Sequence, residues 1–355
     1  MAKKKVALIY GGRSVEHEIS VRSTINVAQY IEKDKFDIYL IGINKKGDWF
    51  HTDSVIYEIG KGEPVHLRLS ASCPAFETET SRFVPDIIFP VLHGTDGEDG
   101  SIQGFFQVVK RPVVGSGVLG SSIAMDKVIS KKLLEAEGLP VAKYFHFTEQ
   151  DRTQIDFEEM CDQLGLPFMI KSANLGSSVG VTKVKDKKTF AEGLKEGFEY
   201  ADEILIETFI EGMEVECAIA GNDPAVSTWP GEIHIKKDYE FYTYAAKYQD
   251  PDAIDMVIPA PLSKEVQWKV RKLSEQAFKA LKCTDYARVD LFVTTEGKVF
   301  LNEVNTIPGF TNVSMFPSMW KNMGVSYPEL ITKLINLASE RWEKESKLQT
   351  HYKKA

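Results

Sequence analysis

The sequence lacks the features that mark secreted, membrane-spanning or nucleic-acid-binding proteins. Only four cysteines occur in 355 residues, scattered and without a C-x-x-C pair, which argues against a disulfide scaffold or zinc site and favours a reduced, cytoplasmic protein. No apolar run is long enough to cross a bilayer. Asp and Glu outnumber Lys and Arg by 51 to 43, and the net charge of -8 argues against a general nucleic-acid or membrane surface.

Two common phosphate-binding signatures are missing as well. The Gly-rich turn at 11–14 lacks the G-x-G-x-x-G spacing of a dinucleotide fingerprint, and the Gly- and Ser-rich loop at 174–180 lacks the G-K-[ST] ending of a Walker motif. What remains is an ordinary globular composition, 43% hydrophobic and 26% charged, in a chain long enough for two or three domains.

The amino-terminal segment predicts a parallel α/β sheet. A buried-type strand at 6–10 is followed by the Gly-rich turn, a helix from about 15 to 32 and a second strand at 36–44. The first βα turn of such a sheet is a usual ligand position. Glu16 at the helix start is either a ligand-binding carboxylate or an acidic residue that suits the helix dipole.

A hairpin at 288–309 predicts a cation site. A two-residue turn at Glu296-Gly297 would place Asp290 opposite Glu303 and Arg288 opposite Asn305, so that these four side chains share one face. Two carboxylates and an amide oxygen suit Mg²⁺. A three-residue loop with a bulge at Gly297 would slip the register and break the set, and an ordinary surface hairpin with a polar face is the other alternative.

Three further side chains have two interpretations each. His93 just past the strand at 86–91 is in an active-site position or is a structural loop histidine. Lys127 opposes the dipole of a helix at 126–137 that Asp126 caps, so it either binds an anion or is simply solvated. Lys171 enters the Gly- and Ser-rich loop, which is either a phosphate-binding loop or a plain hairpin turn.

The segment at 229–259 is irregular and predicts a lid over a site, with Lys247 and Tyr248 as its chemical residues. A packed aromatic loop is the alternative.

Eight segments, in order along nearly the whole chain, together resemble the D-alanine–D-alanine ligase family of the ATP-grasp superfamily. They are GGRSVEHEIS, VLHGTDGEDGSIQG, GSGVLGSSIAMDK, the loop from Lys171 to Gly180, IETFIEGMEVE, Lys247-Tyr248, ARVDLF and LNEVNTIPGFTNVSMFP. The resemblance implies an α/β ATP-grasp fold behind an amino-terminal parallel-sheet domain. The implied domains are residues 1–125, 126–213 and 214–355, with ATP between the last two.

The resemblance also implies a reaction, ATP-dependent joining of two D-alanines through an acylphosphate for peptidoglycan precursor synthesis. Two Mg²⁺ or Mn²⁺ ions would assist in each active site. The protein would be a cytoplasmic homodimer without nucleic-acid or membrane partners. The implied metal ligands are Asp290, Glu303 and Asn305. The implied ATP-binding residues are Lys127, Lys171, Ser177, Ser178, Glu207, Phe209, Ile210, Glu214 and Lys247. The implied substrate-binding residues are Glu16, His93, Tyr248, Arg288, Gly309, Ser314 and Met315. The catalytic group would be Glu16, Ser177, Tyr248 and Arg288.

The alternatives to this reaction are a ligase with another second substrate, another ATP-grasp enzyme, or a protein that is not an enzyme. Tyr248 looks like the dipeptide-forming type, whereas a D-Ala–D-lactate or D-Ala–D-Ser ligase would keep the ATP residues and differ in the second pocket. Another ATP-grasp enzyme should lack Glu16 and Ser314 in these contexts. A non-catalytic nucleotide sensor need not keep Arg288 as an oxyanion donor.

Overall fold

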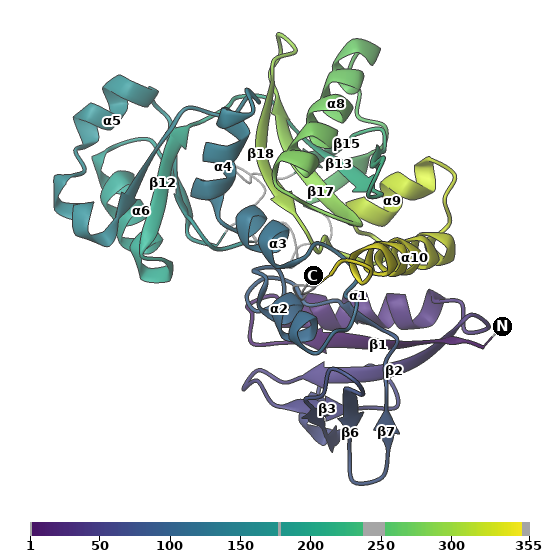
Figure 1. Cartoon of the computed structure of the whole chain (residues 1–355). Helices are drawn as coiled ribbons and strands as arrows, with labels where there is room; N and C mark the ends of the chain where they lie inside the picture. The colour runs from purple at the N-terminus through teal and green to yellow at the C-terminus, as the bar shows by residue number, and fades with distance from the viewer. Residues whose placement is uncertain (1, 177–178, 237–252, 350–355) are drawn as a thin grey trace, which may run out of the picture.

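A computed structural model describes residues 2–176, 179–236 and 253–349, and its strands form four sheets (Figure 1). The first sheet has the order β4-β3-β2-β1-β8. Its strands are β1 (Lys4–Gly11), β2 (Phe36–Ile43), β3 (Trp49–His51), β4 (Glu63–Pro64) and β8 (Ile87–Pro90). Because β1 runs parallel to β2 and β8 while β3 and β4 run antiparallel, the predicted parallel sheet is confirmed at its centre and is mixed at one edge.

Short strands and helices make up the rest of the amino-terminal part. The stretch after β3, which has no clear sequence pattern, forms a small separate sheet of short strands, β5 (His66–Arg68), β6 (Ala75–Glu77) and β7 (Arg82–Phe83). The helices are α1 (His17–Tyr30), η1 (Ile59–Lys61), α2 (Ser101–Val108) and α3 (Val118–Met125).

The second large sheet is antiparallel, in the order β11-β10-β12-β9. Its strands are β9 (Tyr144–Thr148), β10 (Phe168–Ser172), β11 (Val181–Val184) and β12 (Glu203–Thr208), and its helices are α4 (Lys127–Ala136), η2 (Glu149–Gln154), α5 (Phe157–Leu164) and α6 (Lys187–Tyr200). The predicted cap of α4 is confirmed, because the Asp126 side chain accepts a hydrogen bond from the Ile129 N–H. The strands β10 and β11, on either side of the loop at 174–180, pair antiparallel, and residues 177 and 178 of that loop lie outside the described residues.

The third large sheet has the order β16-β15-β13-β17-β18, with β14 beside β13, and its pairings are antiparallel. Its strands are β13 (Met213–Ala220), β14 (Val226–Ser227), β15 (Gly231–Ile235), β16 (Ile254–Val257), β17 (Tyr286–Val293) and β18 (Val299–Asn305). The helices are α8 (Lys264–Ala280), α9 (Met315–Asn322) and α10 (Tyr327–Glu345). The predicted irregular segment therefore begins and ends in strands, β15 and β16.

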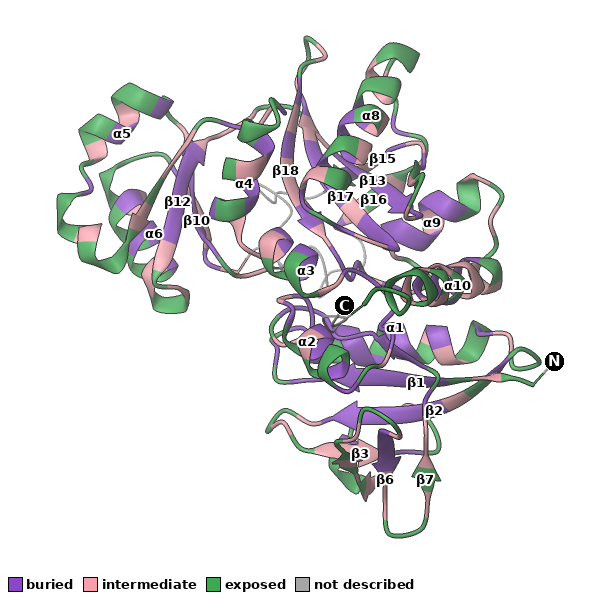
Figure 2. Cartoon of the chain, viewed as in Figure 1, coloured by how far each residue is buried: buried purple, intermediate pink, exposed green. Residues whose placement is uncertain are grey.

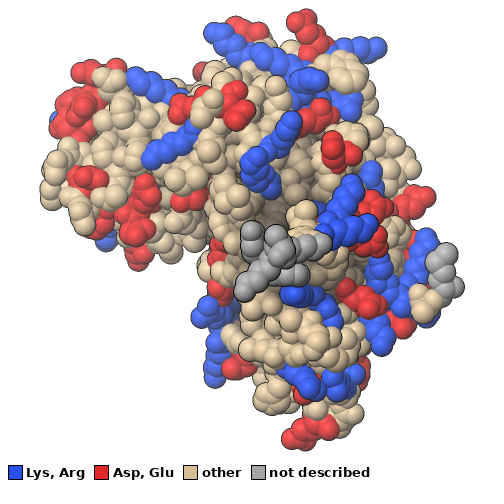
Figure 3. Space-filling view, viewed as in Figure 1, with Lys and Arg blue, Asp and Glu red and all other residues tan. Residues whose placement is uncertain are grey.

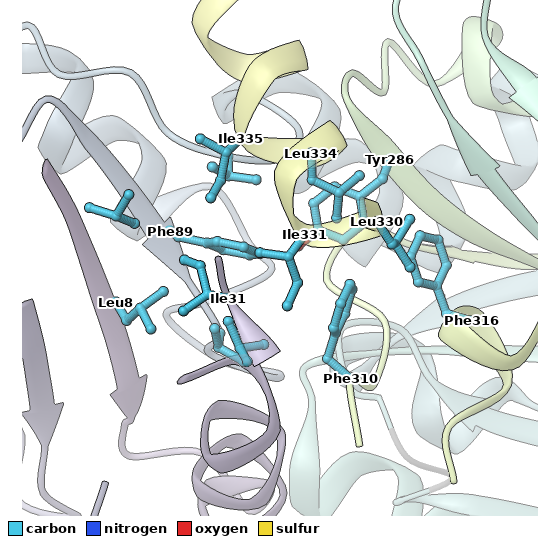
Figure 4. Close-up of a cluster of buried hydrophobic side chains, with 14 of the residues drawn as sticks. Leu8, Ile31, Phe89, Tyr286, Phe310, Phe316, Leu330, Ile331, Leu334 and Ile335 are labelled. Carbon is cyan, nitrogen blue, oxygen red and sulfur yellow. The ribbon is translucent and has the colours of Figure 1, made fainter. Parts of the chain in front are cut away.

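One hydrophobic core joins the first sheet to the carboxyl-terminal helices. Leu8 of β1 and Phe89 of β8 belong to the same buried cluster as Leu330, Ile331 and Leu334 of α10 (Figures 2 and 4). Burying such side chains stabilises the fold by about 1.5–3 kcal/mol each. The first and last thirds of the chain are thus packed together rather than linked by a flexible tether.

The division at residues 125 and 213 stays a prediction, but each large sheet is built from within one of its segments. The junction after residue 125 is less sharp, since Leu134 and Leu139 pack in the core of the third sheet. Among the described helices none is long and apolar enough to cross a membrane. On the face in Figure 3, basic and acidic side chains are intermingled.

Candidate active site

Carboxylates lie in a row across three neighbouring strands of the third sheet. Asp290 of β17 is paired with Glu303 of β18 on one side and with Glu216 of β13 on the other. Arg288 is paired with Asn305, as the hairpin pattern predicts. Directly opposed residues share a face, so this face of the sheet carries a concentrated negative charge that needs cations beside it.

The predicted register is right at Arg288 and Asp290 and wrong nearer the turn, and the predicted turn is wrong. Thr294 and Lys298 are hydrogen-bonded (2.9 Å) around a three-residue loop in which Gly297 has a φ of +76°. That loop shifts the strands by one residue, so Phe292 faces Phe300 and not Leu301. A bulge then restores the register, because Asp290 pairs with Glu303 while its neighbour Leu291 pairs with Leu301.

The extra residue of this bulge is Asn302, which hydrophobic periodicity did not single out. Two residues on the bulged strand oppose one on its partner, and Asn302 and Glu303 both line the same cleft. The Lys171 ammonium donates a hydrogen bond to the Asn302 side-chain oxygen at 3.0 Å. The bulge therefore adds an amide to the polar face and holds a lysine from the second sheet.

Arg288 is enclosed by carboxylates. Its Nε lies 3.0 Å from Glu216 Oε2, and its Nη2 donates to Asp290 Oδ2 at 2.6 Å. The Asn305 amide donates to the same Asp290 oxygen at 3.0 Å. Burial lowers the pKa of Arg288, but Asp290 and Glu216 outweigh that effect and raise it well above its ordinary value. Glu216 is a partner that the sequence alone did not reveal.

A cleft between the second and third sheets gathers most of the predicted ATP-binding residues. It is lined by Lys127, Met169, Lys171, Leu175, Val181, Glu207, Thr208, Phe209, Ile210, Glu214, Phe292, Asn302 and Glu303. Met169, Val181 and Phe292 were not predicted, and they give the cleft apolar walls. Cations at one end and apolar walls elsewhere suit a ligand that has both a planar ring and a charged tail.

A buried group of two lysines and a carboxylate underlies the cleft. Glu207 lies 2.5 Å from the Lys171 ammonium and 2.9 Å from that of Lys131, a residue that sequence analysis missed. Burial raises the pKa of Glu207, but the two lysines reverse this and lower it to about 2. The carboxylate is therefore charged at neutral pH. Lys127 reaches across to Glu303 (3.6 Å) and to the Leu175 carbonyl (2.5 Å).

Glu16 lies at the meeting point of two glycine loops. It is buried just before α1, and a Cβ at Gly94 would stand 2.7 Å from its Oε2. A Cβ at Gly176, in the loop after β10, would stand 3.5 Å from the same oxygen. The structure thus brings Glu16 close to the residue that precedes Ser177.

The residues predicted for the second substrate surround the start of α9. Ser314 is the N-cap residue and Met315 the first helical residue, so backbone N–H groups of the helix terminus are aimed outward there. The Ser314 hydroxyl is 2.8 Å from that of Thr311, and a Cβ at Gly309 would lie 3.0 Å from it. A helix N-terminus favours a carboxylate.

Comparison with known proteins decides the family. Models described as D-ala D-ala ligase N-terminus and D-ala D-ala ligase C-terminus match residues 5–116 and 133–336. This chain belongs to the D-alanine–D-alanine ligase family. A D-alanine–D-alanine ligase of Shouchella clausii is 45% identical over 99% of this chain and 98% of its own length.

Solved D-alanine ligase structures share the fold, which is ATP-grasp. The D-alanine–D-alanine ligase of Coxiella burnetii has a TM-score of 0.87 and 34% identity, covering 98% of this chain and 97% of its own. The VanG D-Ala:D-Ser ligase of Enterococcus faecalis has a TM-score of 0.86 and 35% identity, covering 95% and 100%. The Bacillus anthracis ligase complexed with ATP has a TM-score of 0.74 and 28% identity, covering 96% and 99%.

Four residues predicted from the likeness to D-alanine–D-alanine ligases, namely Ser177, Ser178, Lys247 and Tyr248, lie outside the described residues. The remaining predicted residues converge on two connected places, the cleft and the region between Glu16 and α9. The roles given to individual residues stay predictions.

His93, which the sequence left as either a site residue or a structural loop histidine, is held by two neighbours in the protein. It is buried, with one ring nitrogen 2.8 Å from the Ile307 carbonyl and the other 3.0 Å from the Ser23 hydroxyl. Burial lowers its pKa, which favours the neutral ring. Both nitrogens are therefore engaged by the protein itself.

Proposed function

We propose that this chain joins two D-alanines into D-alanyl-D-alanine and converts ATP to ADP and phosphate. The observation that carries the proposal is the shared face of Arg288, Asp290, Glu303 and Asn305, which borders the lysine-lined cleft between two sheets. Family membership and the ATP complex of a solved relative support the same reading.

ATP would lie in this cleft. Lys127 and Lys171 would bind its phosphates, with Ser177, Ser178 and Lys247 from segments outside the described residues. Glu207 and the backbone at Phe209 and Ile210 would hold the adenine against the apolar walls, and Glu214 would bind the ribose. Because Lys131 and Lys171 keep Glu207 ionised, its oxygens stay acceptors at neutral pH.

The donor set fits Mg²⁺ or Mn²⁺, of which the likeness to the family implies two per active site. No group of three His, Cys, Asp or Glu residues in the described parts of the chain is arranged to hold a metal alone. The set nevertheless fits, because Asp290, Glu303 and Asn305 offer hard oxygens, and Mg²⁺ usually takes only one or two carboxylates with water and phosphate oxygens. Such ions would neutralise charge on the transferring phosphoryl group.

The first D-alanine would be held through its ammonium by Glu16. One of its carboxylate oxygens attacks the γ-phosphorus, the bond to ADP breaks, and an acylphosphate forms. Exclusion of water from the site would protect this intermediate. Positioning and charge neutralisation by Lys127 and Lys171 carry this step.

The second D-alanine would place its carboxylate at Ser314 and the Met315 N–H, at the start of α9. Its amine attacks the acyl carbon, loses a proton, and expels phosphate as the C–O bond breaks. Arg288 and the Gly309 N–H would stabilise the tetrahedral oxyanion. Arg288 starts from an ion pair with Glu216, which keeps its guanidinium on this face of the sheet.

A second candidate product is D-alanyl-D-serine, favoured by the likeness to VanG. Both reactions need the same ATP cleft and differ only in the pocket for the second substrate. We assign the dipeptide of alanine on the basis of Tyr248, which would also complete a network with Glu16 and Ser177.

We also propose a cytoplasmic homodimer. The cysteines are free thiols, which supports a reducing compartment. Exposed apolar side chains gather on α2 and α3, where Val108 is 81% and Leu119 61% exposed. Such a patch suits an interface between two copies. Leu119→Glu should raise the monomer fraction in sedimentation, and an unchanged fraction would remove these helices from the interface.

The test of function is ADP release by the purified protein with Mg²⁺-ATP and D-Ala, D-Ala plus D-Ser, D-Ala plus D-lactate, or L-Ala, with products identified by mass. The proposal predicts ADP release that depends on D-Ala and D-alanyl-D-alanine as the main product. A mixed product with D-Ser or D-lactate in preference to the dipeptide would move the chain to another branch of the family.

A further inference from the structure

The loop that follows β18 is held by side chains from the amino-terminal sheet. Residues 306–308 and Phe310 are buried, yet they form neither helix nor strand. Their backbone groups cannot bond to water and need partners elsewhere. The Ile307 N–H donates to Glu98 Oε1 at 3.1 Å, and the Phe310 N–H donates to the Ser23 hydroxyl oxygen at 3.2 Å.

The direction of each remaining hydrogen bond follows from what each atom can do. The Ile307 carbonyl can only accept, so His93 Nδ1, 2.8 Å away, carries the proton and donates. His93 Nε2 then accepts from the Ser23 hydroxyl, 3.0 Å away. That leaves the oxygen of Ser23 free to accept from Phe310. The neutral ring that this scheme requires agrees with the burial of His93.

Glu98 completes the network on the other side. Its second oxygen accepts from the Gly94 N–H at 2.9 Å, so one carboxyl group joins the loop after β8 to the loop after β18. Tyr327 of α10 donates its hydroxyl to the Phe310 carbonyl and holds the far end of the segment. The loop is thus anchored at Ile307 and at Phe310, with Gly309 between the two anchors.

We infer that Ser23, His93 and Glu98 are positioning residues that fix the 307–310 backbone and thereby aim the Gly309 N–H at the reacting carbonyl. This inference rests on the proposed function, in which that N–H stabilises the oxyanion. It assigns His93 to the loop instead of to the ammonium of the first D-alanine. It also makes the oxyanion donor dependent on contact between the first and third sheets.

Ser23→Ala tests the inference because it removes a hydroxyl that joins His93 to the loop. We expect kcat to fall about 10- to 100-fold, as misplacement by about 1 Å can cost that much, with KM for D-Ala changed less than about twofold. Thr24→Val is the matched control, since within the described parts of the chain its buried hydroxyl bonds only to the Ser20 carbonyl of the same helix. The control should keep the wild-type kcat.

His93 supplies a second, conservative pair. In His93→Asn the amide nitrogen can take the place of Nδ1 and still donate to Ile307, so most of kcat should return relative to His93→Ala. If His93 instead binds the ammonium, both variants should raise KM for D-Ala and leave kcat near wild type. A raised KM with an unchanged kcat in both variants would overturn the inference. Equal loss of kcat in the Asn and Ala variants would overturn it too.

Hydrogen–deuterium exchange over residues 305–312 separates this inference from the proposed reaction. Ser23→Ala should exchange faster there than wild type, and Thr24→Val should not. Unchanged exchange in Ser23→Ala contradicts the anchoring whether or not the protein is a ligase. Failure of the wild type to make dipeptide would contradict the proposed function but would not affect the exchange result. Faster exchange with an unchanged kcat would show that the anchors do not serve catalysis.

Discussion

In the proposed mechanism, Arg288 is the residue on which the chemistry most depends. It lies between Glu216 and Asp290, and a cation at Asp290 would compete with it for the same oxygens. Glu216 then remains as its anchor. The guanidinium can therefore turn toward a developing oxyanion without leaving the sheet face.

Arg288→Ala should lower kcat by about two to three orders of magnitude, as other lost oxyanion donors do. Arg288→Lys keeps the cation and should recover part of the loss. Steady-state ADP release at saturating ATP and D-Ala measures both, with thermal unfolding as the check on folding. An unchanged kcat in the Ala variant would remove Arg288 from the transition state.

Glu207 gives a pH-dependent stability. Its pKa is lowered in the fold from 4.5 to about 2, so its stabilising ion pairs are fully present above pH 4.5 and are lost as pH falls toward 2. Glu207→Gln should reduce the free energy of unfolding by about 3 kcal/mol at neutral pH, because it leaves buried lysines uncompensated.

The difference between wild type and Glu207→Gln should shrink as pH falls from 4.5 toward 2, measured by denaturant unfolding at each pH. Glu149→Gln, which breaks an exposed pair with Arg152, should have little effect at any pH. A difference that stays constant down to pH 2 would mean that Glu207 is not held as a carboxylate.

At the scale of elements, the β17–β18 hairpin shows how far sequence reasoning reaches. Alternation of apolar and polar residues predicted the opposition of Asp290 and Glu303 correctly. It did so through a two-residue turn that does not exist, because the three-residue loop and the bulge at Asn302 each shift the register by one and cancel. Pattern alone cannot locate a compensated pair of irregularities.

Local signals succeeded where the cause is local, as with the Asp126 cap. The short strands between β3 and β8 were not predicted, because their pairing is set by partner strands rather than by hydrophobic periodicity. Sequence analysis missed Glu216, Lys131 and Glu98 for a related reason. Their roles come from partners on other elements, which only the folded chain brings near.

The bulge makes a specific prediction. Deleting Asn302 leaves Glu303 opposite Asp290 and Asn305 opposite Arg288, so Mg²⁺-dependent ADP release should survive within about tenfold. Inserting a glycine between Glu303 and Val304 should instead move Asn305 to the other face and abolish turnover. Loss of turnover on deletion of Asn302, with turnover kept after the glycine insertion, would show that the Lys171–Asn302 contact, and not the register, is what matters.

At the scale of the whole molecule, a buried ion pair of the last third of the chain holds the first third through hydrogen bonds. Arg341 of α10 lies 2.9 Å from Asp285, and it also donates to the Val113 carbonyl at 2.8 Å. Asp285 is fully buried and accepts from the Gly115 N–H. Tyr286, which follows Asp285 in the chain, belongs to the large core drawn in Figure 4.

Arg341→Met should lower the free energy of unfolding by about 3 kcal/mol, the cost of leaving Asp285 buried without its partner. Calorimetry should show a lower midpoint, while kcat at 25 °C should stay near wild type because Arg341 is outside the cleft. Arg152→Met, at an exposed pair, is the control and should change stability by less than about 1 kcal/mol. An unchanged midpoint for Arg341→Met would show that the apolar core alone holds the parts together.

The central claim is that a carboxylate oxygen of the first D-alanine attacks ATP at the face formed by β17 and β18. D-Alanine labelled with ¹⁸O in its carboxylate tests this directly. The account predicts that one ¹⁸O atom moves into the inorganic phosphate for each dipeptide formed, as seen by mass or by phosphorus NMR. Phosphate without the label, released together with dipeptide, would contradict the acylphosphate route and the roles derived from it.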